Sequence, residues 1–298
     1  MALVREGGGG QRKRIRVNGV ARRTTALGGI LRTVMFAPED MLLVAGSPGP
    51  RRSTLDTLAA SRVPSFGPDL ATYGRALQQR NGLLRAIREG AADRDELPFW
   101  DGALIESGSA VVEARLATLK VIAEPLRQAH AEIAPDEGRL TVRYETNAPP
   151  RPGETVRGAL TRRLEETAEK EAWNGTTLIG PHRDDVVFEL EGRDLAGFAS
   201  RGQQRTAILA LKLAELDVLT TLDGRPPLLL LDDVFSELDP DRRAHLVRRI
   251  AELPQAFVTT TTLDDLDPAL RAAGASWSVE AGPDGATLAG PGRPVTVR

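Results

Sequence analysis

The stretch PPLLLLDDVFSELD, residues 226–239, decides the fold class that we expect for this chain. Its four consecutive leucines, Leu228 to Leu231, predict a β-strand that is covered on both faces, as in a parallel sheet. The strand ends in two adjacent carboxylates, Asp232 and Asp233, whose negative charges repel each other. Either these acids simply mark the exposed end of the strand, or they face a cation.

The segments on either side predict α/β organisation. Upstream, residues 203–222 are apolar around most of a helical circumference, which predicts a buried helix capped by Ser200. Downstream, residues 240–253 predict an amphipathic helix and residues 256–262, AFVTTTT, a further strand. Ligands of such folds bind at the carboxyl ends of the parallel strands. We therefore expect a site at the end of the leucine strand.

The two acids and the capped helix suggest phosphate chemistry. An acid at a strand end commonly holds Mg²⁺ beside nucleotide phosphates, and Asp232 is the candidate. Asp233 could orient or deprotonate an attacking water. Ser200 and Gly202 begin a helix whose free N–H groups could bind an anion. An ordinary capped core helix has the same residues, so this helix alone predicts no ligand.

Composition is that of a globular protein. The 298 residues are 41% hydrophobic and 27% charged, with a net charge of −2. The absence of cysteine excludes disulfides, thiolate metal sites and cysteine nucleophiles. The N-terminus lacks the apolar segment of a signal peptide, and no apolar run reaches the roughly 18 residues of a membrane span. We expect a cytoplasmic protein without membrane contact.

Positive charge is concentrated at the N-terminus, where residues 1–36 carry eight Lys or Arg against one acid. ALVRE and KRIRVNG, on either side of a run of four glycines, predict a β-hairpin. Arg12, Arg14 and Arg16, at the start of the second strand and just before it, could contact DNA phosphates. A solvated strand face has the same composition, so both interpretations stay open.

Residues 40–135 are predicted to be mainly helical, and Pro125 should kink the last of these helices or end its first part. A strand is predicted at 139–145, followed by a helix that ends at Asn174–Gly175. Residues 176–195 predict two short strands around the turn GPHRDD. His182, Asp184 and Asp185 of this turn have the composition of a metal site, but ligands so close in sequence seldom converge on one ion. We interpret the segment as a hydrogen-bonded turn, or as a contact to a partner or nucleic acid.

Two motifs carry a resemblance to a known family. SRGQQR (200–205) and LLLLDDVFSELD (228–239) resemble the signature and the Walker B/D-loop motifs of ABC-type ATPases of the SMC-like branch. With VNGVARR (17–23), FAPEDMLLVAGSPGPRR (36–52), FWDGALIESG (99–108) and LIGPHRDD (178–185), the chain resembles the RecF family of recombination mediators from about residue 15 to 265.

The resemblance implies an ABC/SMC-type P-loop NTPase head, a mixed sheet flanked by helices, with a helical second lobe. It divides the chain into three parts. Residues 1–36 would be a remnant of ATPase lobe I, residues 37–198 a helical lobe II with a small sheet, and residues 199–298 the signature and Walker B part of the ATPase core.

The resemblance also implies roles for single residues. Asp232 falls on the Walker B acid that binds Mg²⁺, and Asp233 on the hydrolytic position. The signature loop, which in this family contacts the γ-phosphate of ATP on the opposite subunit, comprises Ser200, Arg201, Gly202 and Gln203. The D-loop comprises Ser236, Glu237, Leu238 and Asp239. The threonines at 259–262 follow the strand at which ABC enzymes often place a switch histidine, and a threonine there could bond phosphate but could not titrate.

In function, the resemblance implies DNA repair, replication and recombination within the SOS response. It implies weak ATPase activity with ATP and Mg²⁺, and ATP-dependent dimerisation on DNA at single-strand gaps and junctions. RecR, RecO and RecA are the implied protein partners, with help in loading RecA as the outcome.

One motif of the family is absent. None of the four lysines follows a glycine, so the 298 residues contain no Gly-x-x-x-x-Gly-Lys-Ser/Thr loop. The family carries this Walker A loop near its N-terminus, and we interpret the chain as N-terminally truncated. We expect ATP binding in cis to be impaired, while the signature loop could still reach a partner's ATP.

Two other functions remain open at this point. The first is a scaffold that binds DNA or protein without ATPase activity. The second is a nuclease-like site in which Asp232, Asp233 and Glu237 hold two Mg²⁺ ions, although such sites need carboxylates from separate elements. Cleavage of DNA without ATP would favour the second.

Overall fold

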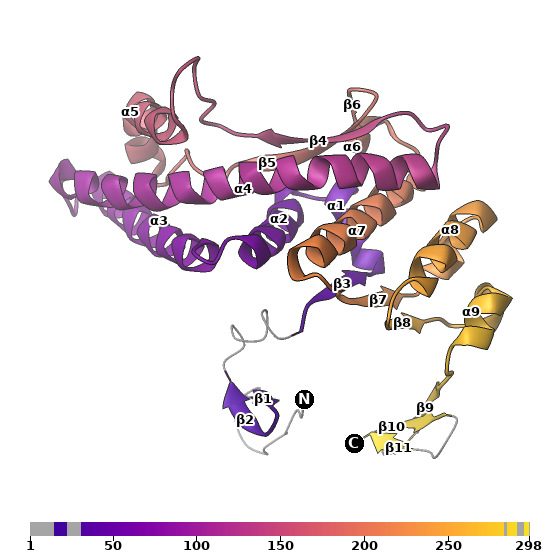
Figure 1. Cartoon of the computed structure of the whole chain (residues 1–298). Coiled ribbons are helices and arrows are strands. Elements are labelled where there is room, and N and C mark those ends of the chain that lie inside the picture. The colour runs from indigo at the N-terminus through magenta and orange to yellow at the C-terminus, as the bar shows by residue number, and fades with distance from the viewer. Residues whose placement is uncertain (1–14, 23–30, 283–284, 291–294, 298) are drawn as a thin grey trace. The chain divides into compact units, whose positions relative to one another are not determined.

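The computed structural model describes residues 15–22, 31–282, 285–290 and 295–297. Its backbone contacts divide the chain into two compact units (Figure 1). The first unit comprises the residues up to 34 together with 39–227, and the second comprises 35–38 together with 228–298. The three-part division at residues 36 and 198 remains a prediction, because it groups residues by motif and not by contact.

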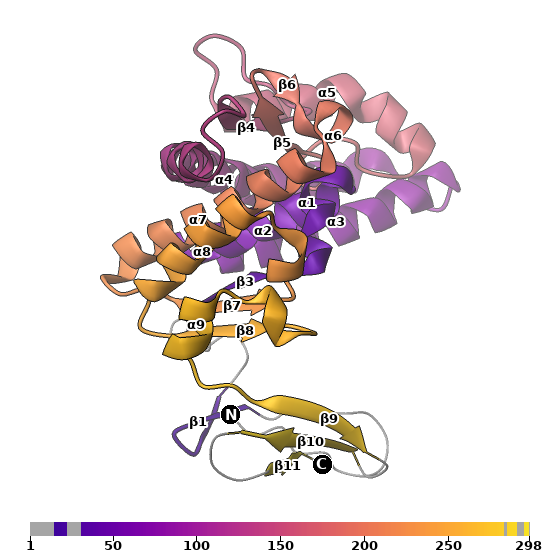
Figure 2. The same ribbon diagram turned by 90° about the vertical axis from the view of Figure 1, so that its right-hand side faces the viewer.

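The first unit is mainly helical. Its α-helices are α1 (Leu42–Ala45), α2 (Pro48–Arg62), α3 (Phe66–Arg88), α4 (Leu97–Ile133), α5 (Val156–Asn174), α6 (Leu195–Phe198) and α7 (Arg201–Asp223). Short 3₁₀ turns, η2 (Pro38–Met41) and η3 (Arg94–Glu96), precede α1 and α4. The long helix α4 packs along α3, α5 and α7 (Figures 1 and 2). In the described part of the chain no helix is both long and apolar enough to span a membrane.

Helix α4 continues through Pro125, so the prediction that this proline would end its first part is wrong. A proline removes one hydrogen bond of the helix and crowds the preceding turn. On either side of it, Ile122, Leu126 and Ala129 are all at least 97% buried. Because most helical stability in proteins comes from packing of an apolar face, this burial offsets the missing bond.

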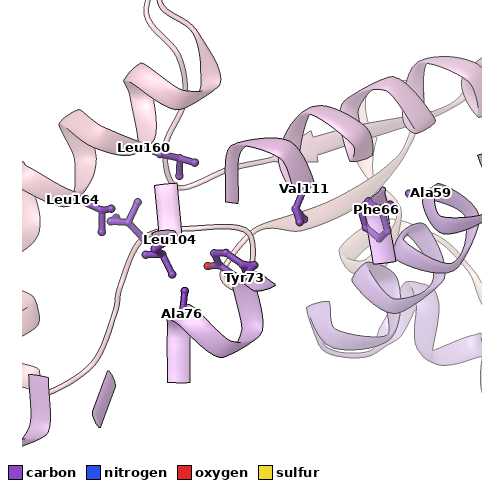
Figure 3. Close-up of a cluster of buried hydrophobic side chains, with 10 residues drawn as sticks. Ala59, Phe66, Tyr73, Ala76, Leu104, Val111, Leu160 and Leu164 are labelled. Carbon is purple, nitrogen blue, oxygen red and sulfur yellow. The ribbon is translucent and has the colours of Figure 1, made fainter. Parts of the chain in front are cut away.

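The hydrophobic cluster between α2, α3, α4 and α5 holds this bundle together (Figure 3). Phe66 and Val111 are almost completely buried, and Leu160 and Leu164 reach the cluster from α5. Helix α5 ends as predicted, since Gly175 adopts a left-handed conformation with φ 65° directly after Asn174.

A small antiparallel sheet completes the first unit. It contains β4 (Leu140–Glu145), β5 (Asp185–Leu190) and β6 (Arg193–Asp194), with Leu140 opposite Leu190. The first of the two strands predicted at 176–195 does not form. Its backbone N–H groups donate to side chains and not to a neighbouring strand. The acceptors are Asn81 for Thr177 N (2.7 Å), Glu171 for Leu178 N (2.7 Å) and Asn147 for Gly180 N (3.1 Å).

The GPHRDD turn is a hydrogen-bonded turn, as interpreted from the sequence. The carboxylate of Asp184 accepts from the Tyr144 hydroxyl (2.8 Å) and the Asn147 backbone N–H (3.1 Å). Asp185 accepts two bonds from the Arg51 guanidinium, at 2.8 and 2.7 Å. Burial lowers the pKa of His182 to about 4, which keeps this side chain neutral near pH 7. No group of three metal-ligating side chains occurs among the described residues.

Arg115 joins this turn to the helices from a buried position. Its guanidinium is 3% exposed and donates to both carboxylate oxygens of Asp56, at 2.7 and 2.9 Å. The same group donates to the Pro181 carbonyl (2.7 Å) and the Tyr144 hydroxyl (3.2 Å). Arg115 therefore connects α2, α4, β4 and the turn through one side chain.

A second buried ionic group lies on α7. Lys212 Nζ is 3.1 Å from Asp40 Oδ1 and 3.9 Å from Glu215 Oε2. Burial raises the pKa of Glu215 to about 7, an effect that Lys212 opposes and Asp40 reinforces. In the unfolded chain the same carboxyl group ionises at its ordinary pKa near 4.5.

This difference in pKa predicts a pH-dependent contribution to stability. Between about pH 4.5 and 7 the folded chain holds the Glu215 proton that the unfolded chain has lost, so the free energy of unfolding falls as pH rises. Glu215→Gln removes this term. We expect the free energy of unfolding of the variant, relative to the unmutated chain, to increase by about 2–3 kcal/mol between pH 5 and pH 8 in urea titrations. The exposed Glu165→Gln is the control, and a difference for Glu215→Gln that stays constant over this range would contradict the prediction.

The second unit is built on a three-stranded sheet with the order β3-β7-β8. Its strands are β3 (Thr33–Phe36), which ends in this unit, β7 (Leu228–Asp232) and β8 (Ala256–Thr259). β7 and β8 are parallel, with Asp232 opposite Thr259. The unit also contains η4 (Phe235–Glu237), α8 (Pro240–Ala251), η5 (Leu263–Asp265) and α9 (Pro268–Ala273), and an antiparallel sheet of β9 (Ser278–Gly282), β10 (Gly285–Ala289) and β11 (Val295–Val297).

The leucine strand is buried on one face only. Leu229 and Leu231 are 1% and 2% exposed, whereas Leu228 and Leu230 are half-buried. The prediction of a strand covered on both faces is therefore only partly right. The predicted order of helix, strand, helix and strand is confirmed in α7, β7, α8 and β8, and the fold is the expected mixed α/β class with a parallel sheet and flanking helices.

A hairpin that the sequence did not predict lies near the N-terminus. β1 (Ile15–Val17) pairs with β2 (Val20–Arg22) across Asn18–Gly19, whose φ angles are 50° and 81°. An Asn-Gly pair with positive φ suits a two-residue hairpin turn. The predicted partner strand at 2–6 lies outside the described residues.

Candidate functional site

The acids that end β7 lie beside the end of β8. Asp232 Oδ1 accepts a hydrogen bond from the Thr259 hydroxyl at 2.5 Å. The backbone N–H of Asp233 is 3.2 Å from both the carbonyl and the hydroxyl oxygen of Thr259. Thr259 thus connects the carboxyl ends of the two parallel strands through these three contacts.

Asp233 is held in an unusual conformation. Its φ is 50°, in the left-handed region that residues other than glycine rarely adopt. Its Oδ1 atom is buried and has no hydrogen-bond partner in the described part of the chain. Since a buried carboxylate oxygen without a partner is costly, this atom marks a place where a water or a ligand would be stabilised.

These two carboxylates fit a magnesium site. Mg²⁺ prefers oxygen ligands and usually takes only one or two carboxylates from the protein, with waters and substrate phosphates completing its shell. The second oxygen of Asp232, Oδ2, makes no hydrogen bond in the described residues, and Asp233 Oδ1 is unpartnered. Asp232 would hold the ion and Asp233 a water near it.

The predicted D-loop follows directly and is fixed by its own contacts. The Ser236 hydroxyl donates to the Asp233 carbonyl at 3.0 Å, and Leu238 is buried. Asp239 caps α8 by accepting from the Arg242 backbone N–H at 3.0 Å. Burial opposes ionisation of Asp239, but the Arg242 N–H and guanidinium outweigh it and lower the pKa of this carboxyl group. The side chain of Glu237 lies outside the described structure.

The predicted signature loop begins α7 in the first unit. The Ser200 hydroxyl accepts from the Gln203 backbone N–H at 3.2 Å, and the Gln203 side-chain oxygen accepts from the Ser200 N–H at 3.0 Å. This reciprocal pair is a capping box, of which the sequence predicted only the serine. Thr206, the sixth residue of the helix, is already fully buried.

The capping box presents polar groups outward. Ser200 and Arg201 are exposed, and Gly202 is half-buried. Because a serine hydroxyl can both accept and donate, accepting from Gln203 leaves the Ser200 O–H free to donate to an anion. The start of this 23-residue helix has the donors and the dipole that favour a phosphate.

The structure brings together most of the predicted residues within each unit. In the second unit, Asp232 and Asp233 both contact Thr259, and Ser236 contacts Asp233, whereas Asp239 caps α8. Residues 200–203 form one helix start in the first unit. Arg16 is exposed on β1, while Arg12 and Arg14 lie outside the described residues. The contact of Thr259 with Asp232 was missed, because it depends on the register of β7 and β8.

Similar proteins are known over most of the length of this chain. No family model matches the chain. The DNA replication and repair protein RecF of Herpetosiphon aurantiacus is 40% identical over 259 residues, which are 86% of this chain and 66% of that protein. RecF of Bacillus subtilis is 42% identical over 254 residues, 83% of this chain and 68% of that protein. This chain thus spans about two thirds of the length of these relatives.

Solved structures give the same result. The recombination mediator protein RecF-ATPrS of the RecFOR pathway matches with a TM-score of 0.80 and 30% identity, over 91% of this chain and 72% of that one. The RecF-ATP structure of the same pathway matches with a TM-score of 0.76 and 32% identity, over 85% and 69% of the two chains. Sequence and structure together show that the chain belongs to the RecF family of DNA replication and repair proteins.

Proposed function

We propose that this chain supplies the Walker B, D-loop and signature parts of a RecF-type ATPase that acts in DNA repair, replication and recombination. The observation that carries the proposal is the acid pair at the end of β7, where Asp233 Oδ1 is buried without a partner. Support also comes from the related proteins, whose solved structures are named RecF-ATP and RecF-ATPrS.

In this proposal Asp232 holds Mg²⁺ and Asp233 orients the water that attacks ATP. The ion would neutralise charge on the phosphates, which is the main catalytic need in phosphoryl transfer. The D-loop residues after Asp233 would reach the partner subunit. Ser200, Arg201, Gly202 and Gln203 would contact the γ-phosphate of the ATP bound by that partner.

The proposed setting is the cytoplasm, where two subunits would dimerise on ATP at junctions between single-stranded and double-stranded DNA. RecR, RecO and RecA would be the protein partners, and loading of RecA at the gap the result. Arg16 could contribute to DNA binding, because it is exposed and lies in the positively charged N-terminal region.

The proposal is tested with an extended protein, in which this chain follows an N-terminal segment carrying the phosphate-binding loop of the family. The measurement is binding to a gapped DNA duplex, with and without ATP. We expect ATP to tighten binding at least tenfold. The 298-residue chain without the segment is the comparison.

Ser200→Arg should weaken ATP-dependent dimerisation of the extended protein. Arginine removes the hydroxyl donor and the capping box, and its bulk would keep the partner's phosphate away from the start of the helix. We expect the ATP-dependent dimer, measured by sedimentation, to weaken at least tenfold, while each subunit still binds ATP. Ser65→Arg is the matched control, since Ser65 is exposed at the N-terminus of α3 and makes no capping hydrogen bond. An intact ATP-dependent dimer in Ser200→Arg would disprove the role of the signature loop.

Two alternatives make different predictions in these experiments. A scaffold without ATPase function would bind DNA equally well with and without ATP. A nuclease-like site of Asp232, Asp233 and Glu237 would cleave DNA with Mg²⁺ in the absence of ATP. Either result would replace the proposal.

A further inference from the structure

Thr259, at the end of β8, contacts both acids at the end of β7. Its hydroxyl and its carbonyl make three contacts with Asp232 and Asp233, at 2.5, 3.2 and 3.2 Å. The register of the parallel strands places it directly opposite Asp232. All of these contacts lie within the second unit.

The hydroxyl proton determines which oxygen of Asp232 is available. An O–H group has one proton to donate, and Thr259 gives it to Asp232 Oδ1. The rotation of the carboxylate is thereby set, and Oδ2 is left for a cation. A hydrogen bond to an ionised carboxylate is among the stronger kinds, so this orientation is well defined.

The acceptor side of the same hydroxyl acts on Asp233. Its oxygen and the Thr259 carbonyl share the Asp233 backbone N–H. These contacts help to hold a residue whose φ of 50° is unfavourable for aspartate. The left-handed backbone sets the direction in which the Asp233 side chain leaves the chain. In this direction its Oδ1 atom is buried and has no hydrogen-bond partner among the described residues.

The neighbouring threonines do not share this arrangement. Thr260 Oγ1 donates to the Thr262 carbonyl at 2.7 Å and accepts from the Thr262 N–H at 3.3 Å, so it closes a local turn. The Thr262 hydroxyl accepts from the Asp264 N–H at 3.4 Å at the start of η5. Thr259 is therefore the member of the run that contacts the acid pair.

We infer that Thr259 is a positioning residue that presents Asp232 to Mg²⁺ and Asp233 to a water, rather than a group that contacts the γ-phosphate. The inference rests on the proposed ATPase function and assigns this residue to the Walker B acids. A valine has the shape of threonine but no hydroxyl, whereas a serine keeps the hydroxyl. The pair Thr259→Val and Thr259→Ser therefore separates hydrogen bonding from packing.

The test measures binding of a fluorescent ATP analogue by the extended protein while the Mg²⁺ concentration is varied. We expect Thr259→Val to raise the Mg²⁺ concentration for half-maximal binding about fivefold to tenfold, as expected for loss of a group that orients a metal ligand. The same variant should lower kcat about tenfold with little change in KM for ATP. Thr259→Ser should stay within threefold of the unmutated protein in both measurements.

Controls separate the possible failures. Thr57→Val makes the same substitution on α2, where the hydroxyl donates to the Ser53 carbonyl of its own helix. Urea unfolding of the 298-residue chain checks that Thr259→Val remains folded. A valine variant with unchanged Mg²⁺ dependence and kcat, or a serine variant as impaired as the valine one, would overturn the role of the hydroxyl. If the unmutated extended protein bound no ATP, the proposed function itself would fail and this role with it.

Discussion

Asp233→Asn is expected to reduce ATP hydrolysis by the extended protein about 10²- to 10³-fold, which is the usual cost of removing a group that accepts a proton from, or orients, the reacting water. Asparagine has nearly the same shape as aspartate, so the left-handed backbone at residue 233 and the contacts with Thr259 should persist. Binding of ATP should change less than threefold. The measurement is single-turnover hydrolysis beside equilibrium binding.

Asp241→Asn is the matched control for this variant. Asp241 lies in the same unit, in the first turn of α8, and is exposed. The Asp241→Asn variant should hydrolyse ATP at the same rate as the unmutated protein. If Asp233→Asn retained more than a tenth of the normal rate, Asp233 would not have the proposed role, and the unpartnered Oδ1 would need another explanation.

Arg115→Leu is expected to destabilise the first unit by about 3–5 kcal/mol, the usual cost of removing one partner of a buried charged pair. The substitution leaves the Asp56 carboxylate and the Pro181 carbonyl without the donor that now satisfies them. The connection of α2 and α4 to the GPHRDD turn would be lost with it. The measurement is urea unfolding followed by far-ultraviolet circular dichroism.

Arg127→Leu is the matched control for this second effect. Arg127 also makes a two-pronged contact with a carboxylate, that of Glu124, but both side chains are 40% or more exposed. Exposed ion pairs contribute about 0.2–1 kcal/mol, so the two variants should differ several-fold. Equal losses of stability in the two variants would show that the contacts of Arg115 with Asp56 and Pro181 do not stabilise the first unit more than an exposed ion pair does.

The sequence predicted the elements whose local pattern agrees with their packing. The leucine strand, the amphipathic helix after it and the next strand were all visible from periodicity and turn residues. The Ser200 cap and the Gly175 helix end were visible for the same reason, since each depends on one residue and its immediate neighbours.

The errors came from contacts between distant residues. No local pattern shows that Asn81, Asn147 and Glu171 take up the N–H groups at 177–180 and so prevent a strand. Pro125 was expected to kink a helix or to end its first part, and the helix continues because of packing partners that the local sequence does not show. At the site, the acids were predicted from one strand, but the contact between Asp232 and Thr259 depends on the register of two strands, which sequence periodicity does not determine.

The most direct test of the account is Mg²⁺-dependent binding of ATP by the extended protein and by its Asp232→Asn variant, measured by isothermal titration calorimetry. We expect Mg²⁺ to strengthen ATP binding of the unmutated protein at least tenfold, and Asp232→Asn to lose most of this strengthening. Equal Mg²⁺ dependence in the two proteins, or no binding of ATP by either, would contradict the claim that the acids at the end of β7 serve a magnesium–nucleotide site.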